Sequence, residues 1–272
     1  MRKLSLVLWL LPAVCGGCAG QYILTVPDQV APAGGQAVCV IRVQRAEVAL
    51  LALPVPDAAM RLRVDDGDER GAYTDALGYA GTTVRVPATP GRYTLRVALQ
   101  DPRGDEAHAS APLYVWEPNR PAFAVDLDSL PPALMKDAAT AAKAALLRLA
   151  SEGDILYMTR RAVEEHPAAH QELARAGFPD GPVLLWQRER WHVVRENQWS
   201  IPRVVVESRL VNQIAGLRTM FPGLQTGVTS SDLSAKAFAE AGLKVVLIGP
   251  AAAVGPNVVR RADWNDLARQ GP

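Results

Sequence analysis

The stretch that decides the fold of the second half of this 272-residue chain is Phe123-Ala124-Val125-Asp126-Leu127-Asp128-Ser129-Leu130. Its apolar start is typical of a buried strand, and two carboxylates, two residues apart, follow at the end of that strand. In an open α/β sheet, ligands bind outside the carboxyl ends of the strands. One aspartate can attack a phosphoryl group or hold Mg²⁺, while the other exchanges a proton with the leaving oxygen. The alternative is a strand-end loop in which an acid caps a helix.

Strands and helices alternate after the stiff linker Glu117-Pro118-Asn119-Arg120-Pro121. Further strands are predicted over residues 154–158, 183–186, 225–228 and 244–248, and helices over 137–151, 164–176, 207–220 and 233–241. Repeated β-then-α order builds a mostly parallel sheet that is covered on both faces. Residues 119–272 are therefore expected to form an α/β domain, with a loop at 249–256 and a terminal turn at 263–267.

The preceding residues, 21–118, show short alternating segments between turn residues, without a helical period. We predict strands over 22–26, 36–43, 59–64, 82–86, 93–99 and 111–115, and from them an antiparallel β-sandwich. The run from Tyr73 to Val97 resembles bacterial immunoglobulin-like modules of surface proteins. The acidic turn Asp65-Asp66-Gly67-Asp68 is predicted to be a solvated hairpin rather than a calcium loop, because its spacing differs from the twelve-residue loop.

Residues 1–20 have the pattern of a targeting segment, with a basic start, an apolar stretch and a small-residue region. A cysteine after small residues resembles the bacterial lipoprotein signal, for which Cys18 fits better than Cys15; plain secretion or an uncleaved anchor are the alternatives. The chain is thus expected to be exported and lipid-anchored in the bacterial cell envelope. Cys39 would be the only cysteine of the mature protein, which excludes an internal disulfide framework, and is predicted to be a buried strand residue.

Charge and composition point away from nucleic acid. Lys plus Arg number 29 and Asp plus Glu 28, so no whole-protein field attracts a polyanion. Hydrophobic residues make up 49% and charged residues 21% of the chain, which is ordinary for a folded globular protein. A small-molecule or neutral partner fits this balance best.

Polar residues follow the strands of the second half at three points. These are Asp126 with Asp128, the run Thr159-Arg160-Arg161, and the run 227–232, Gly-Val-Thr-Ser-Ser-Asp. If the strands are parallel neighbours, all three gather at one edge of the sheet. A carboxylate nucleophile, a hydroxyl, a cation and a further acid gathered there would suit phosphoryl transfer.

These pieces resemble the haloacid dehalogenase superfamily of phosphohydrolases, over residues 121 to about 267. The lipin-type and fungal actin-patch-type phosphatidate phosphatase domains are the most similar branches. The phrase that carries most of the resemblance is Gly177-Phe178-Pro179-Asp180-Gly181-Pro182-Val183-Leu184-Leu185. The resemblance implies Asp126 as nucleophile and Mg²⁺ ligand, Asp128 as general acid and base and a further metal residue, Thr159 as phosphate anchor and Asp232 as Mg²⁺ ligand.

The chain departs from the superfamily pattern at several positions. Leu130 stands where a threonine is customary, and Val228 and Thr229 replace the Asn and Arg of the last motif. The expected lysine has Arg209 as its nearest counterpart, which would hold the phosphate in a different geometry. A protein that has lost turnover is therefore the alternative to an enzyme.

One histidine pair has metal-ligand spacing. His166 and His170 lie four residues apart, which places two nitrogens on one helical face, but Pro167 intervenes and no acid follows at a recognised zinc spacing. A zinc site is therefore not predicted from the sequence.

The sequence supports three hypotheses. The first is a magnesium-dependent phosphomonoester hydrolase that acts on phosphatidate or a related phosphorylated small molecule or lipid, at a membrane reached through the lipid anchor. The second is a surface protein that binds a phosphorylated ligand or a protein partner without cleaving it, and the third is a structural envelope protein.

Overall fold

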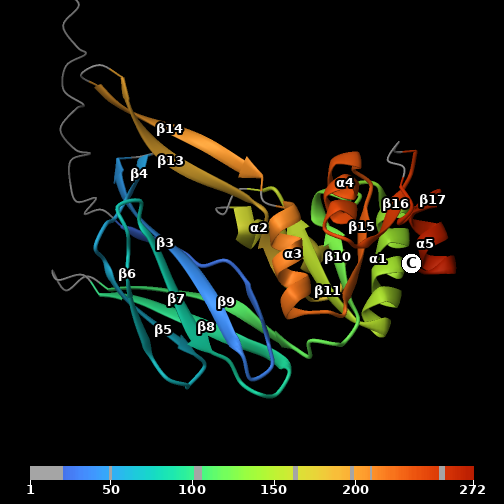
Figure 1. Cartoon of the computed structure of the whole chain (residues 1–272), viewed down its shortest axis with the longest axis horizontal. Helices are drawn as coiled ribbons and strands as arrows, with labels where there is room; N and C mark the ends of the chain where they lie inside the picture. The colour runs from blue at the N-terminus through green and yellow to red at the C-terminus, as the bar shows by residue number, and fades with distance from the viewer. Residues whose placement is uncertain are drawn as a thin grey trace, which may run out of the picture.

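A computed structural model describes residues 21–48, 51–100, 106–161, 165–196, 199–208, 210–250 and 255–272. It contains a β-rich part formed by the first third of the chain and an α/β part formed by the rest (Figure 1). The targeting segment with Cys15 and Cys18, and also Arg209, lie outside the described residues. No helix in the described ranges is long and apolar enough to cross a membrane.

The β-rich part is a sandwich of two sheets. In one sheet β3 lies between β1 and both β4 and β7; in the other the order is β2-β9-β8-β5-β6. All pairs are antiparallel except β2 with β9, which is parallel. The strands are β1 (Tyr22–Thr25), β2 (Gln29–Pro32), β3 (Gln36–Val48), β4 (Leu51–Pro54), β5 (Ala59–Val64), β6 (Arg70–Tyr73), β7 (Tyr79–Arg85), β8 (Gly91–Gln100) and β9 (Glu106–Trp116).

Side chains at every second position along the strands form the core of this sandwich. In β5, Met60, Leu62 and Val64 are buried while the two arginines between them are exposed. Each fully buried aliphatic side chain contributes roughly 1.5–3 kcal/mol relative to leaving it in water. Cys39 is a buried strand residue, as predicted, and burial raises the pKa of its thiol to about 12.

The acidic turn between β5 and β6 is a hairpin turn, as predicted. Asp65 has φ 43°, and its carboxylate accepts a hydrogen bond from the Thr94 backbone N–H at 3.0 Å. An aspartate tolerates this left-handed conformation better than most residues. The sequence prediction missed β2, β4 and β6, which are only four residues long each and too short to show an alternation of their own.

The α/β part contains a six-stranded sheet of order β12-β11-β10-β15-β16-β17, and every neighbouring pair is parallel. Helices α1 and α5 pack on one face, and α3 and α4 on the other (Figure 1). The elements are β10 (Ala122–Asp126), η1 (Leu127–Ser129), α1 (Lys136–Glu152), β11 (Asp154–Thr159), α2 (His166–Ala176), β12 (Val183–Leu185), α3 (Leu210–Met220), β15 (Leu224–Thr229), α4 (Asp232–Glu240), β16 (Lys244–Ile248), β17 (Val258–Arg261) and α5 (Trp264–Gln270). The predicted parallel α/β architecture is therefore confirmed.

A hairpin that the sequence analysis did not predict leaves this sheet after β12. It is formed by β13 (Gln187–Glu196) and β14 (Trp199–Ser208), paired antiparallel, and it projects away from the parallel sheet (Figure 1). The predicted helix over 207–220 was wrong at its start, because β14 extends to Ser208 and the helix begins at Leu210. The run of β-branched residues at 204–206 favours the strand.

The chain end also differs from the prediction. A strand, β17, pairs with β16, and the expected terminal turn is the helix α5. The Asp263 carboxylate caps α5 by accepting from the Asp266 N–H at 2.9 Å. A four-residue strand and a seven-residue helix are too short for their periodicity to stand out in the sequence.

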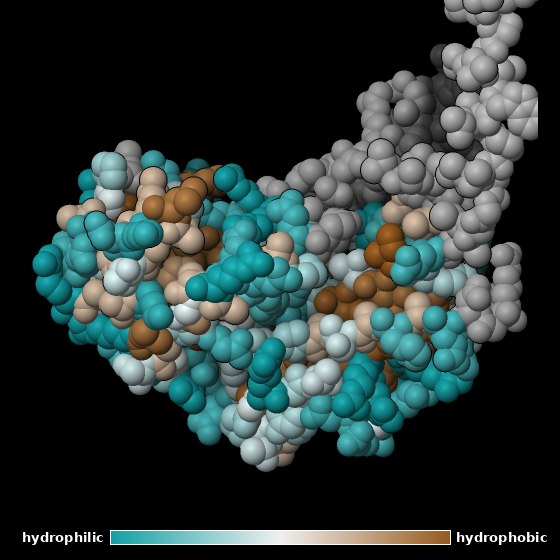
Figure 2. Space-filling model, turned by 180° about the vertical axis from the view of Figure 1, so that it is seen from behind, coloured by the Kyte–Doolittle hydropathy of each residue, from teal (hydrophilic) through white to brown (hydrophobic). Residues whose placement is uncertain are grey.

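Sandwich and α/β part share a packed boundary beside the linker. Tyr114 and Trp116, at the end of β9, belong to the same core as α3 and α4, and the Trp116 ring meets the Phe221 ring edge-on with centroids 5.6 Å apart. Gly223 lies so close to the linker backbone that a Cβ there would be 1.9 Å from the Arg120 carbonyl oxygen. On the face shown in Figure 2, hydrophobic residues show over the α/β part only in separate patches between hydrophilic ones.

Candidate functional site

Asp126 is the last residue of β10, a strand buried along its whole length. Its side chain is 3% exposed and caps η1, because its Oδ1 accepts from the Asp128 N–H at 3.1 Å. The other oxygen, Oδ2, accepts from the hydroxyls of Ser129 and Thr229, each at 2.8 Å. The capping contact considered in the sequence analysis is present, together with two further hydrogen bonds that capping does not require.

Asp128 is the middle residue of η1, two residues after Asp126, and contacts the end of β11. Its Oδ1 accepts from the Thr159 hydroxyl at 2.7 Å, and its Oδ2 accepts from the Arg160 N–H at 2.9 Å. The guanidinium groups of Arg160 and Arg161 lie 3.7 and 3.5 Å from the carboxylate. Its side chain is 16% exposed, so this carboxylate keeps access to solvent while two cations balance its charge.

Parallel register brings these groups together. β10 pairs with both β11 and β15, so the strand ends at Asp126, Thr159 and Thr229 lie at the same edge of the sheet. The structure thus joins three of the predicted residues, Asp126, Asp128 and Thr159. Asp232 is exposed at the first position of α4, following the N-cap Ser231. In the described part of the chain, the carboxylates of Asp126, Asp128 and Asp232 do not form a set within 4.8 Å of one another.

The substituted motif positions have definite places in the structure. Val228 is completely buried in the core under α1 and α5, so it offers no ligand. Thr229 belongs to the polar run that was expected at this sheet edge and was given no role of its own, yet its buried hydroxyl binds Asp126. The signal was available: Val228 pairs with Val125, which places Thr229 at the level of Asp126 once the two strands are known to be neighbours.

Asp126 has the surroundings of a cation ligand. It is a buried carboxylate, and among the residues that the structure describes no cationic side chain pairs with it. A buried charge that meets only neutral donors is costly unless a counter-ion balances it. Carboxylate and hydroxyl oxygens are hard ligands of the kind that Mg²⁺ prefers. Of the three predicted metal residues only Asp126 has these surroundings, so the Mg²⁺ site stays a prediction from the sequence.

A second group of titratable side chains lies at the boundary between the two parts. Asp28, in the turn between β1 and β2, lies 2.8 Å from His170 and 3.3 Å from His166, measured from its carboxylate oxygens to Nε2 of each ring. The histidine pair is visible in the sequence but its acid is not, because Asp28 is 138 residues away from His166 along the chain. Only the packing of the sandwich against α2 brings the acid to the pair.

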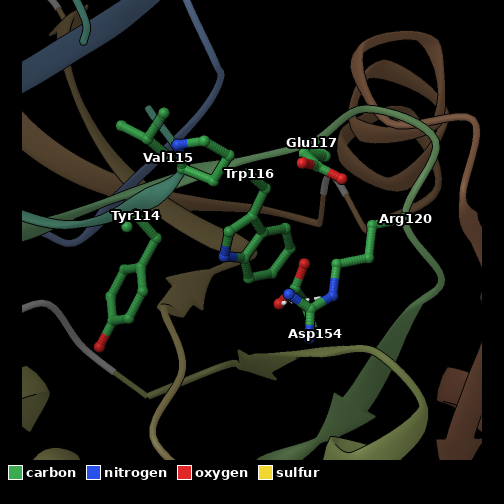
Figure 3. A pocket seen from close by; sticks show the side chains of 8 residues that line it. Tyr114, Val115, Trp116, Glu117, Arg120 and Asp154 are labelled. Atoms are coloured by element: carbon green, nitrogen blue, oxygen red, sulfur yellow. Dashed lines mark ion pairs between the residues drawn. The ribbon is translucent and has the colours of Figure 1, made fainter. Parts of the chain in front are cut away.

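A cavity of 220 Å³ opens at the same boundary (Figure 3). Arg120 and Asp154 form an ion pair of 3.6 Å at its wall, with Trp116 and Tyr114 beside them. Asp154 begins β11, whereas Thr159 ends it, so this cavity lies at the opposite edge of the sheet from Asp126. It is not connected with the strand-end carboxylates.

Comparisons with known proteins leave the family open. No family model matches the chain, and no curated protein matches it. The haloacid dehalogenase resemblance therefore stays a prediction from the sequence motifs.

Similar solved structures resemble the chain only weakly. The immunoglobulin module of the Drosophila receptor protein tyrosine phosphatase DLAR has 14% identity and a TM-score of 0.27, over 39% of this chain and 59% of that chain. A carbohydrate acetylesterase from Xanthomonas citri has 13% identity and a TM-score of 0.28, over 83% of this chain and 51% of that chain. This chain thus spans less than two thirds of either protein. The assignment of a β-sandwich rests on the strand order described above.

Proposed function

We propose that the α/β domain is a haloacid-dehalogenase-type phosphomonoester hydrolase in which Asp126 is the nucleophile and Asp128 the general acid and base. The single observation that carries this proposal is the placement of two carboxylates side by side at the carboxyl edge of a parallel sheet, with the hydroxyls of Thr159 and Thr229 bound to them. That edge is where open α/β sheets bind their ligands.

Hydrogen bonding distinguishes the two oxygens of Asp126. Oδ2 accepts two hydroxyl protons at 2.8 Å, whereas Oδ1 accepts one backbone N–H at 3.1 Å. Oδ1 therefore keeps more of its nucleophilic electron density and is the atom that attacks phosphorus. Attack forms the Oδ1–P bond of an aspartyl-phosphate and breaks the bond from phosphorus to the ester oxygen, which leaves as an alcohol.

Asp128 moves the protons. In its protonated form it gives the proton to the departing ester oxygen, and as a carboxylate it then takes one from the water that hydrolyses the aspartyl-phosphate. Phosphate and the original Asp126 are the products. The Thr159 hydroxyl and the Arg160 N–H hold the Asp128 carboxylate in place for both transfers.

Charge neutralisation comes from two sources. A Mg²⁺ ion held by Asp126, with Asp128 and Asp232 as the other predicted metal residues, would neutralise the phosphate oxygens when bound. The guanidinium groups of Arg160 and Arg161 lie beside Asp128, and Arg161 also pairs with Glu172 at 2.7 Å. Planar guanidinium groups suit phosphate recognition.

A lipid phosphate is the proposed substrate class. The resemblance to phosphatidate phosphatase domains favours it, and so do two exposed apolar side chains, Leu134 at 95% and Met135 at 61%, in the segment that joins η1 to α1. Exposed apolar residues beside a site can contact a lipid surface. Export and a lipid anchor at Cys18 would keep the domain at a membrane of the cell envelope.

A second candidate function is binding of a phosphorylated ligand without turnover. It is favoured by the environment of Asp126, since every oxygen of this carboxylate already accepts hydrogen bonds and Val228 gives no further ligand. A carboxylate held in this way can recognise a cation without acting as a nucleophile.

Release of phosphate discriminates between the two candidates. The full chain is incubated with an aryl phosphate, and separately with phosphatidate vesicles, in the presence of Mg²⁺ or of a chelator. We expect turnover that needs Mg²⁺ and is abolished by Asp126→Asn but kept by Asp137→Asn, because Asp137 is exposed on α1. Turnover that is equal in all three proteins would contradict the hydrolase; Mg²⁺-dependent binding without release in the unsubstituted protein would support the second candidate.

A further inference from the structure

Asp28, His166 and His170 form a compact group where the sandwich meets α2. One ligand atom from each lies within 4.8 Å of the other two, and they are the only such group of three acids, cysteines or histidines in the described part of the chain. We infer that these three side chains are a binding site for a divalent metal ion of the zinc class, and that the ion joins the β-sandwich to the α/β domain.

The distances are of the size that metal coordination needs. Zinc bonds of 2.0–2.1 Å to imidazole nitrogen and carboxylate oxygen, at tetrahedral angles, separate neighbouring ligand atoms by about 3.3 Å. The His166 Nε2 to Asp28 Oδ1 distance is 3.3 Å, and the His170 Nε2 to Asp28 Oδ2 distance is 2.8 Å. Each ring thus lies beside a different oxygen of the same carboxylate, and the three ligand atoms lie within 4.8 Å of one another.

The carboxylate is buried without a complete set of partners. The Asp28 side chain is fully buried, and its Oδ1 makes no hydrogen bond within the described part of the molecule. Its other oxygen accepts the Val183 N–H at 2.8 Å in addition to the contact with His170. An oxygen that is removed from water and left without a donor is unfavourable, and a bound metal ion would satisfy it.

The two rings have the right placement. They lie four residues apart in α2, on the same helical face, and α2 faces the sandwich (Figure 1). The Val183 N–H holds Oδ2 of the carboxylate, as supporting hydrogen bonds do around metal sites.

The burial of the three side chains limits the number of further ligands that a bound ion could take. The side chains of Asp28 and His166 are 0% and 8% exposed, and that of His170 is 27% exposed. His170 is therefore the most solvent-accessible of the three ligands, and a water on its side would be the fourth ligand. Two histidines and a carboxylate can also hold octahedral iron, but that needs three open positions. The enclosed geometry favours a tetrahedral ion.

Metal binding is tested on the full chain after treatment with a chelator. Zn²⁺ is titrated calorimetrically, and Co²⁺ is titrated while its visible absorption is recorded, because tetrahedral Co²⁺ absorbs strongly. We expect one equivalent to bind, with a tetrahedral Co²⁺ spectrum, and to bind more weakly at pH 5 than at pH 7, because the ion displaces the imidazole protons.

His170→Ala is the informative variant, since His170 is the most exposed ligand and its loss disturbs the core least. Its affinity should fall by at least roughly 100-fold, because loss of a supporting partner alone already costs 10–100-fold. His108→Ala serves as the control, because His108 lies on β9 with a side chain 68% exposed. Circular dichroism verifies that each variant is folded, and His170→Gln replaces His170→Ala if that variant is not.

The results separate this site from the strand-end carboxylates. Asp126→Asn should leave the zinc stoichiometry and the Co²⁺ spectrum unchanged, and none of these readouts depends on phosphate release. Absence of Zn²⁺ binding in the unsubstituted protein, or equal affinity in His170→Ala and His108→Ala, would overturn the inference; Asp28 and the histidines would then be a hydrogen-bonded contact alone.

Discussion

The strand-end carboxylates and the boundary group Asp28, His166 and His170 are built from similar residues but differ in origin. Asp126 and Asp128 come from one short stretch and meet Thr159 and Thr229 because parallel strands end together. The boundary group depends on two domains that pack against each other. The first surrounds a carboxylate with hydroxyl oxygens and the second with imidazoles, so the first suits a hard cation and the second a zinc-class ion.

Substitution of one carboxylate in each group should separate their roles most sharply. Asp128→Asn removes the proton carrier and should lower kcat by roughly 10²–10⁴-fold. Asp28→Asn should leave kcat within about twofold, because Asp28 touches none of the reacting groups. Steady-state rates with an aryl phosphate measure both. If Asp28→Asn were as damaging as Asp128→Asn, the two groups would not be functionally separate.

The free energy of unfolding, unlike kcat, should depend strongly on Asp28. Asp28→Ala leaves the Val183 N–H and the His170 ring without their buried acceptor and removes the carboxylate beside His166, and should lower the free energy of unfolding by about 3–5 kcal/mol. Asp137→Ala, at an exposed position, should change it by less than about 0.5 kcal/mol. Urea denaturation in the presence of a chelator measures both values. Equal stability of the two variants would mean that the boundary group does not hold the domains together.

Thr229→Val tests whether the hydroxyls around Asp126 matter to the fold as well as to the site. A hydrogen bond to a buried charged group is lost, so the free energy of unfolding should fall by about 1.5–3 kcal/mol. Thr219→Val is the matched control, since that hydroxyl is exposed and bonds only the Ala215 carbonyl of its own helix. If both variants lost the same free energy of unfolding, the loss would come from replacing a threonine hydroxyl by a methyl group in general, and not from the missing hydrogen bond to Asp126.

The boundary group should also make stability depend on pH. Burial lowers the pKa of His166 below the unfolded value of about 6.5, so the unfolded chain takes up a proton first as the pH falls. Its contribution is complete above pH 6.5 and is lost as the pH falls toward the folded pKa, at up to about 1.4 kcal/mol per pH unit. Denaturation curves of the metal-free protein between pH 7.5 and pH 5 measure this slope, and His166→Gln should flatten it. An unchanged slope in that variant would assign the dependence to Asp28, His170 or other groups.

Local sequence patterns were sufficient to predict most of the fold. Buried runs and helix terminators placed β10, β11, β15 and β16 within a residue or two, and Gly177, with φ 66°, ends α2 where the sequence predicts a helix end. The hairpin of β13 and β14 was missed because long β-branched and aromatic runs beside a helix give an ambiguous boundary. The start of α3 was misplaced for the same reason.

The two candidate sites differ in the same way in how far the sequence could predict them. Asp126, Asp128 and Thr159 could be predicted because each follows a strand whose end is visible in the sequence, and the parallel sheet brings them together. The hydroxyl of Thr229 could have been recognised only after the neighbouring strand was known. Asp28 could not have been assigned, because nothing in its local sequence records that the turn between β1 and β2 packs against α2.

Direct detection of the phosphorylated nucleophile is the most stringent test of the hydrolase proposal. The full chain is mixed with an aryl phosphate and Mg²⁺, quenched in acid and digested, and the peptide that contains Asp126 is analysed by mass spectrometry. The account predicts that this peptide gains the mass of one phosphoryl group in the unsubstituted protein and not in Asp126→Asn. Turnover without any phosphorylated Asp126, or phosphorylation of another residue that persists in Asp126→Asn, would contradict it.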